Sequence, residues 1–481
     1  MQPSKFTFLA SRLWLILVLA AFTLGTNGFS QGFSSRFEEI KRTATPSQLY
    51  AFLYALPKGG DLHNHLGGAI RSEWWYAVAT DPARDGHDTL YTRVKFTAGI
   101  ETGVPLVLYH TIRQFSYARL DPARQSDYVR LDALTPAQRQ GWLDSLRLER
   151  AGEGRDEFFN AIWPRIEGLE NNLHIVTNVL VETMRAYGAE GLRYLETQLG
   201  PEGYFENDGT PIPVERVVST LRTRLSESDA LASGVTVRFQ ACAIRFDPAA
   251  ERELEALYLF VDAHRDLWVG LNMAGIEENG KGYPLRFLDK FRELRRTHPS
   301  LALSIHAGEM DGPDQNVRET LRLGATRIGH GVNLIKDADT LLLLQNSQRV
   351  LVEINLISNR LLEYTPDLAK HPFPEYLRTG VPVCLNTDDR GMWDSNLTDE
   401  YYTAVSLFNL SWEEIVLLGR NSLTYSFAQP EVKAQLLSEY RKAVADFEAR
   451  FLATDSLNLT REIKPITYGY GRRTWGFSFS P

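Results

Sequence analysis

The chain has 481 residues, a formal net charge of −8 and a hydrophobic fraction of 43%. It is long enough for a full hydrophobic core, and a barrel with insertions can hold nearly all of it as one unit. A mildly acidic chain with no basic stripe has no electrostatic reason to bind nucleic acid or an anionic membrane.

The N-terminus predicts a signal peptide in residues 1–30. Lys5 and Arg12 precede an apolar run at residues 13–24 (LWLILVLAAFTL), and small and polar residues follow it. A run of this length suits a cleavable signal better than a bilayer-spanning helix, although an uncleaved anchor is the alternative. We therefore expect an exported protein, periplasmic or secreted, with no membrane contact after signal cleavage.

Short apolar runs then alternate with helical patterns. The predicted strands lie at residues 60–65, 192–199, 235–244, 267–274, 301–306, 327–332, 350–356 and 381–386. Continuous apolar runs are typical of parallel strands that are buried on both faces. We predict an α/β fold, a (β/α)8 TIM-type barrel over residues 31–455. A doubly wound sheet is less favoured, because no G-x-G-x-x-G turn follows the first strand.

Helical spacing of apolar residues fills most intervals between these strands. The predicted helices lie at residues 156–187, 213–226, 249–264, 285–298, 314–323, 337–346 and 374–379, and Pro164 is a candidate break in the first of them. Residues 81–155 form a mainly helical insertion after the first strand; a lid over the active face and a solvated excursion are both open interpretations. Residues 456–481 form an aromatic, basic C-terminal tail, either packed on the barrel or free of it.

Polar residues gather at the predicted strand ends. His63 and His65 (LHNH) occupy alternate positions, so their rings point the same way and can share one divalent metal. His306 ends another strand, and a glycine turn brings Glu309 over the same region. Each pattern alone is equally typical of ordinary core or surface residues.

Two further strand ends add to this set. His330 lies between two glycines (IGHG), and the acids Asp388 and Asp389 follow a buried strand, where they need a cation or hydrogen-bonding partners. A barrel gathers the carboxyl ends of its strands at one face. Three imidazoles and one carboxylate there suit zinc with room for a water molecule. Cys242 and Cys384 form no C-x-x-C pair, so thiolate ligands are disfavoured, and we expect two buried free thiols.

The segments LHNHLGGA, NMAGIEE, SIHAGEM, IGHGVNL and LNTDDRG occur in this order over the last 420 or so residues. In these segments the chain resembles the adenosine deaminase family of the metal-dependent amidohydrolase superfamily. The predicted signal peptide and the insertion are similar to those of its secreted, growth-factor-like branch.

The resemblance implies a role for each strand-end residue. His63, His65, His306 and Asp388 would bind one zinc ion per chain. Glu309 would donate a proton to purine N1, and His330 would orient and deprotonate the attacking water. Asp389 would accept a hydrogen bond from the purine at N7, and the backbone N–H of Gly275 would meet N3.

One position departs from the family pattern. Family members carry an acid two residues after the second metal histidine, where it contacts the ribose; this chain has Gly67 there. The metal site is unaffected, but the contact with the sugar is changed. A modified nucleoside, a deoxynucleoside or a nucleotide are therefore alternative substrates.

We thus expect zinc-dependent hydrolytic deamination of adenosine or a related purine nucleoside. The alternatives are an amidohydrolase acting on another cyclic amidine or amide, and a non-catalytic nucleoside-binding or signalling protein. The second alternative would be indicated by loss of a ligand or of Glu309, and all are present. The sequence does not predict the oligomeric state.

Overall fold

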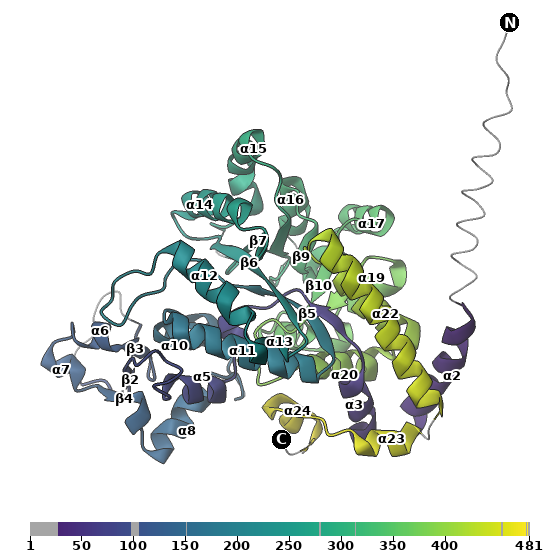
Figure 1. The fold of residues 1–481 in the computed structure, drawn as a ribbon. Coiled ribbons are helices and arrows are strands. Elements are labelled where there is room, and N and C mark those ends of the chain that lie inside the picture. The colour runs from purple at the N-terminus through teal and green to yellow at the C-terminus, as the bar shows by residue number, and fades with distance from the viewer. Residues whose placement is uncertain are drawn as a thin grey trace, which may run out of the picture.

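Eight parallel strands form the centre of the computed structural model, as the sequence predicted (Figure 1). The structure describes residues 27–97, 105–150, 152–278, 280–312, 314–453, 456–477 and 479. The barrel strands are β1 (Gly59–Asp61), β5 (Leu192–Gln198), β6 (Thr236–Ile244), β7 (Trp268–Ala274), β8 (Leu303–Ala307), β9 (Arg327–His330), β10 (Leu351–Ile354) and β11 (Val383–Leu385). Each predicted strand segment overlaps one of them.

The first and last strands meet just beyond their ends, which closes the barrel. A parallel bridge joins Asn64 to Asp388, and the Asp388 N–H donates to the carbonyl of His63 at 2.9 Å. β1 is shorter than predicted, so His63 and His65 follow the strand instead of ending it. Their backbone stays in register with the neighbouring strand, because His65 forms a bridge with Gln198.

Helices cover the outside of the barrel (Figure 1). They are α11 (Leu173–Ala189), α12 (Val214–Leu225), α13 (Ser228–Leu231), α14 (Ala250–Ala263), η3 (Pro284–Phe287), α15 (Leu288–Thr297), α16 (Asn316–Leu323), η4 (Val332–Lys336), α17 (Ala338–Ser347), α18 (Leu356–Leu361), η5 (Leu368–Lys370), α19 (Phe373–Thr379), α20 (Leu397–Phe408), α21 (Trp412–Thr424) and α22 (Pro430–Ala453). Alternation of strand and helix with all strands parallel is the arrangement of a TIM-type barrel.

The interior of the barrel is more polar than the apolar strand runs suggested. Arg327 is fully buried, with Nη2 2.7 Å from Glu196 and Nε 2.6 Å from Glu353. A charged group taken out of water needs such partners. Glu353 in turn contacts His63, so this ion network reaches the residues above it.

The terminal segments pack on the barrel. At the N-terminal side α2 (Asn27–Thr43) precedes α3 (Pro46–Ala55), which begins with a capping box between Thr45 and Gln48. The tail forms α23 (Ser456–Glu462) and α24 (Gly469–Trp475), and Tyr470 and Phe477 are buried. Of the two interpretations of the tail, the packed one is therefore correct.

The apolar run of the predicted signal peptide, residues 13–24, lies outside the described residues. Within the described part, no helix is both long enough and apolar enough to cross a membrane.

The insertion differs from the mainly helical prediction. It contains a three-stranded antiparallel sheet of β2 (Leu90–Arg93), β3 (Thr111–Arg113) and β4 (Tyr128–Arg130). Its helices are α6 (Gln114–Tyr117), α7 (Pro122–Gln125), η1 (Leu131–Ala133) and α8 (Pro136–Ser145). Strands of three or four residues are too short to show a periodicity of two, so the sequence pattern missed them. That the insertion acts as a lid stays a prediction.

The predicted helix over residues 156–187 is divided, but not at Pro164. α9 (Arg155–Glu157), the π-helical η2 (Phe158–Ile162) and α10 (Trp163–Glu170) follow one another, and Pro164 stands in the first turn of α10, where its missing N–H is tolerated. The chain breaks at Asn171 and Asn172 instead. Asn172 caps α11 by accepting from the N–H groups of His174 and Ile175 at 3.0 and 3.1 Å.

Candidate metal centre and active site

A cavity of about 440 Å³ opens at the carboxyl ends of the barrel strands, and we call it the main cavity. Its polar wall comes from the ends of β1, β8, β9 and β11. Phe158, Phe159 and Trp163 of η2 and α10 supply an apolar wall. A largely apolar cavity with a few converging polar groups is the usual form of a small-molecule site.

Four side chains meet at one point of this cavity. His63 and His65 follow β1, His306 belongs to β8 and Asp388 follows β11, and one ligand atom from each lies within 4.8 Å of the other three. Nε2 of His63 is 3.6 Å from Oδ1 of Asp388. The structure thus brings together all four predicted ligands, which span more than 300 positions of the sequence.

The same four residues carry buried polar atoms without partners. Nε2 of each of the three histidines and Oδ1 of Asp388 have no hydrogen-bond partner within the described part of the chain. Leaving buried polar atoms unpaired is costly, and a divalent cation bound to all four would remove that cost. Three imidazole nitrogens and one carboxylate oxygen are a ligand set that zinc accepts. The residues therefore fit a metal ion.

The second polar atom of each ligand side chain contacts a neighbouring residue. Nδ1 of His63 lies 2.7 Å from Glu353, and Nδ1 of His306 lies 2.8 Å from Oδ1 of Asn272. Ser358 donates to Oδ2 of Asp388 at 2.6 Å. Such partners orient metal ligands and fix the histidine tautomer.

These partners were not identified in the sequence, although a charged residue inside the apolar run LVEI of β10 was a signal for Glu353.

His65 is oriented by an acid of the site itself. Its Nδ1 lies 3.0 and 3.1 Å from the two carboxylate oxygens of Asp389, and 3.3 Å from Asp388. Asp389 packs against Gly68, where an added Cβ would overlap its carboxylate. Position 68 therefore needs a glycine if Asp389 is to stay beside His65.

Two site residues have left-handed backbone conformations that non-glycine residues rarely adopt. The φ angle is 62° at His330 and 52° at Asp388. Residues held in such conformations are over-represented at functional sites, where the surrounding structure imposes them. Gly275 also has a positive φ, 103°, and a Cβ there would approach the ring of Phe246 to 2.7 Å. The backbone of Gly275 is thus left open to the main cavity.

Glu309 and His330 lie side by side in the main cavity. Oε1 of Glu309 is 3.4 Å from Nδ1 of His330, and the amide nitrogens of Asn355 and Asn359 lie 3.2 and 3.0 Å from the same Nδ1. Burial, and then the charges of Asp388 and Glu277, raise the pKa of Glu309 well above its usual value. Burial, and then the neighbouring His63, lower the pKa of His330 well below its usual value. These shifts favour a protonated Glu309 beside a neutral His330.

Asp389 also has a raised pKa. Burial is the largest cause, and the charge of Asp388 adds to it, so that the pKa is about 7 although His65 opposes the shift.

Cys242 lines the same cavity as a free thiol whose pKa burial raises to about 11, and Cys384 is a buried free thiol. Both cysteines are thus unpaired, as predicted, and Cys242 is only partly buried.

We expect Glu353→Gln to weaken zinc binding by about 10- to 100-fold, because the change removes the charge that holds Nδ1 of His63. Calorimetric zinc titration of the metal-free protein measures this. Glu375→Gln, on an exposed position of α19, is the matched control. Unchanged zinc affinity in a folded Glu353→Gln protein would remove Glu353 from the support of the site.

The comparisons with known proteins identify the family of this chain. The family model described as adenosine deaminase matches residues 157–443. An adenosine deaminase from Enterococcus faecalis is 32% identical over 247 residues, which cover 51% of this chain and 70% of that protein.

Solved structures show the same fold at lower identity. An amidohydrolase from Burkholderia ambifaria, with bound Zn, has a TM-score of 0.61 at 18% identity, over 85% of this chain and 95% of that one. The Arabidopsis protein ADAL, complexed with IMP, has a TM-score of 0.59 at 22% identity, over 82% of this chain and 99% of that one.

Proposed function

Because this chain belongs to the adenosine deaminase family of metal-dependent hydrolases, we propose that it deaminates adenosine or a closely related purine nucleoside, with one zinc ion per chain as cofactor. The proposal depends on a single observation. The three histidines and Asp388 meet in one cavity with the acid–imidazole pair of Glu309 and His330 beside them.

Zinc is the metal that this ligand set favours. His63, His65, His306 and Asp388 offer three nitrogens and one oxygen and no thiolate. Zinc held there would act as a Lewis acid and bring the pKa of a water molecule to about 7. The Zn in the Burkholderia ambifaria structure supports the choice of metal.

The chain's own residues supply the proton transfers. Burial lowers the pKa of His330, which favours the neutral imidazole that can orient the attacking water and accept its proton. Attack at C6 moves electron density onto N1 of the purine. Burial raises the pKa of Glu309, which favours the protonated form that can deliver a proton to N1. The proton that His330 took from the water then passes to the amino group, the C6–N bond breaks and ammonia leaves, and the proton of the C6 hydroxyl returns to Glu309 as the carbonyl forms.

Purine binding is assigned to Gly275 and Asp389. The open backbone N–H of Gly275 can donate to N3. Adenosine N7 has a lone pair and no proton, so a hydrogen bond with Asp389 needs the proton on the carboxyl group. The raised pKa of Asp389 provides this, and the direction of this hydrogen bond is then the reverse of that expected from the sequence.

A substrate panel tests the proposal. Zinc-loaded protein is incubated with adenosine, 2′-deoxyadenosine, N6-methyladenosine, AMP and adenine, and the released amine is measured: methylamine from N6-methyladenosine and ammonia from the other four. We expect release from at least one nucleoside. A folded, zinc-loaded protein that releases neither ammonia nor methylamine from any of the five would overturn the proposal and favour a different amidohydrolase or a nucleoside-binding protein.

We also propose that the protein is exported, on the basis of the apolar run at residues 13–24. N-terminal sequencing of the protein from an expressing cell tests this. An N-terminus at Met1 would contradict cleavage. Placement in the growth-factor-like branch remains a prediction.

A further inference from the structure

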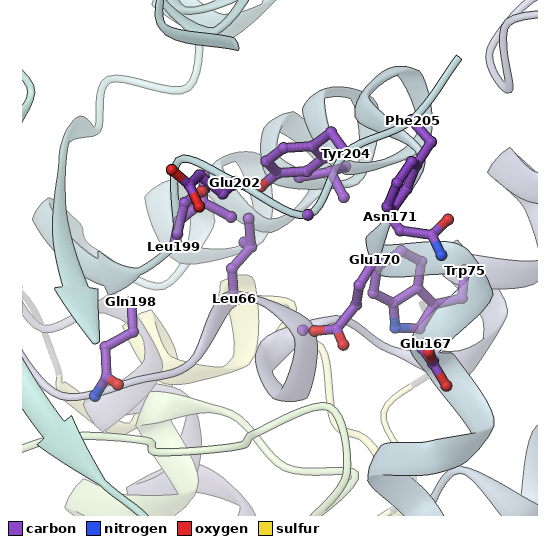
Figure 2. A pocket seen from close by; sticks show the side chains of 14 residues that line it. Leu66, Trp75, Glu167, Glu170, Asn171, Gln198, Leu199, Glu202, Tyr204 and Phe205 are labelled. Carbon is purple, nitrogen blue, oxygen red and sulfur yellow. Dashed lines mark hydrogen bonds between the residues drawn. The ribbon is translucent and has the colours of Figure 1, made fainter. Parts of the chain in front are cut away.

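A second cavity, of about 420 Å³, adjoins the main cavity, and we call it the side chamber. The two cavities share a stretch of wall made by Leu66, Gly67, Glu170, Gln198, Leu199 and Gly200. Figure 2 shows the side chamber with Tyr204 and Phe205 on one side and the helix that carries Glu170 on another. A ligand whose base lies in the main cavity would extend past this shared wall.

Glu170, the last residue of α10, occupies the space that a side chain at position 67 would need. A Cβ on Gly67, in the short helix α4 (Leu66–Ala69), would overlap Oε1 of Glu170 and come within 3.2 Å of Trp163. Figure 2 shows the Glu170 carboxylate pointing toward the segment that carries Leu66. A carboxylate therefore stands where the sequence lacks one, supplied by a residue 103 positions further along the chain.

The carboxyl group of Glu170 is available to a ligand. Within the described residues it makes no hydrogen bond or ion pair. Burial, and then the charge of Asp389, raise its pKa to about 8. In either protonation state it can pair with a hydroxyl group, and in neither state does it offer a positive charge.

Gln198 is a second unpaired polar group in the shared wall. It ends β5, its side chain lines both cavities, and it is only 7% exposed. Neither Oε1 nor Nε2 has a hydrogen-bond partner in the part of the chain that the structure describes. Its backbone N–H donates to the carbonyl of Asn64 at 2.9 Å, which holds it beside the metal histidines. Buried amides are normally paired, so a ligand is the missing partner.

The side chamber has acidic residues and no basic ones. Glu167 and Glu202 line its outer part, and none of the described residues lining either cavity is a lysine or arginine. Arg113 lies behind the wall, but its Nη1 donates to the carbonyls of Asn171 and Phe205 at 3.0 and 2.7 Å. A phosphate group in this chamber would meet the carboxylates of Glu167, whose partner is His110 at 3.6 Å, and of Glu202, and no lysine or arginine of the described lining would pair with it.

We propose that Glu170 and Gln198 bind the sugar hydroxyls of the substrate, and that the side chamber admits nucleosides and rejects nucleotide 5′-phosphates. This inference rests on the proposed function and narrows its substrate class. Hydroxyl groups can donate to Glu170 and can both donate to and accept from the amide of Gln198. Rejection of the phosphate comes from the exposed carboxylates of Glu167 and Glu202 and from the lack of a lysine or arginine in the described lining, since a specific site often uses a repulsive element as well as an attractive one.

Equilibrium binding tests this without any turnover. Calorimetry on the zinc-loaded protein measures Kd for inosine, IMP and hypoxanthine. We expect inosine to bind at least about 100-fold more tightly than IMP, because like charges brought together without compensation are strongly unfavourable. Equal or tighter binding of IMP would overturn the assignment.

Variants separate the sugar contact from a general structural role. Glu170→Ala and Gln198→Ala should each weaken inosine binding, by about 10- to 100-fold for Glu170, and leave hypoxanthine binding within about twofold. Glu215→Ala, on the exposed face of α12, is the matched control. An equal loss for inosine and hypoxanthine, or no loss for inosine in either folded variant, would contradict the proposal.

A double variant tests whether side chains at positions 67 and 170 compete for the same space. Gly67→Asp alone should weaken inosine binding because its Cβ overlaps Glu170. Gly67→Asp combined with Glu170→Ala should bind inosine more tightly than either single variant; weaker binding than both would argue against the shared space. Inosine selectivity without ammonia release in the substrate panel would refute the proposed function and leave this assignment standing.

Discussion

Glu309→Gln is expected to retain zinc and to lose most of its turnover, by about 10²- to 10⁴-fold in kcat. Glutamine has the same shape and can donate a hydrogen bond, but it cannot transfer a proton to N1. Glu309 is 8% exposed, and the carboxylate of Glu277 accepts hydrogen bonds from the backbone N–H groups of Gly308 and Glu309, both at 3.1 Å. The substitution should therefore leave the fold and the metal ligands in place, and the loss should appear in kcat at full zinc occupancy.

Ammonia release under substrate saturation, together with zinc analysis of the same sample, measures this effect. Glu278→Gln makes the same change on a nearby loop, where the side chain is 31% exposed and pairs with Arg155, and it should keep its activity. If Glu309→Gln turns over at the rate of the unaltered protein, Glu309 is not the proton donor.

His63→Ala is expected to abolish tight zinc binding and, with it, activity. The substitution removes one of four ligand atoms and leaves Glu353 facing an empty space in the barrel interior. Metal that binds only the folded state stabilises it by mass action, so a chelator should lower the Tm of the unaltered protein. The Tm of His63→Ala should not respond to the chelator.

Zinc content by mass spectrometry and Tm with and without chelator are the measurements. His298→Ala, at a partly exposed histidine outside the cavity, is the control and should keep one zinc per chain. Full zinc occupancy in His63→Ala would refute the assignment of His63 as a ligand and weaken the proposed function with it.

Much of the barrel and of its site follows from local sequence pattern. A short continuous apolar run is typical of a parallel strand that is buried on both faces. Each of the eight predicted runs accordingly overlaps a strand of the barrel. Histidines two positions apart next to such a strand, as at His63 and His65, project to the same side because of extended backbone geometry. Because a barrel gathers the carboxyl ends of its strands at one face, His306 and Asp388 lie beside them.

The tertiary structure alone decided which residues complete the site. Glu353 contacts His63 from 290 positions further along the chain, and Glu170 fills the space beside Gly67 from 103 positions further along. Nothing in the sequence pairs these residues. The left-handed backbone of His330 and Asp388 contradicts their local preference and exists because the closed barrel imposes it. Local pattern determines strands and the residues at their ends, whereas contacts between distant segments depend on how the closed barrel packs.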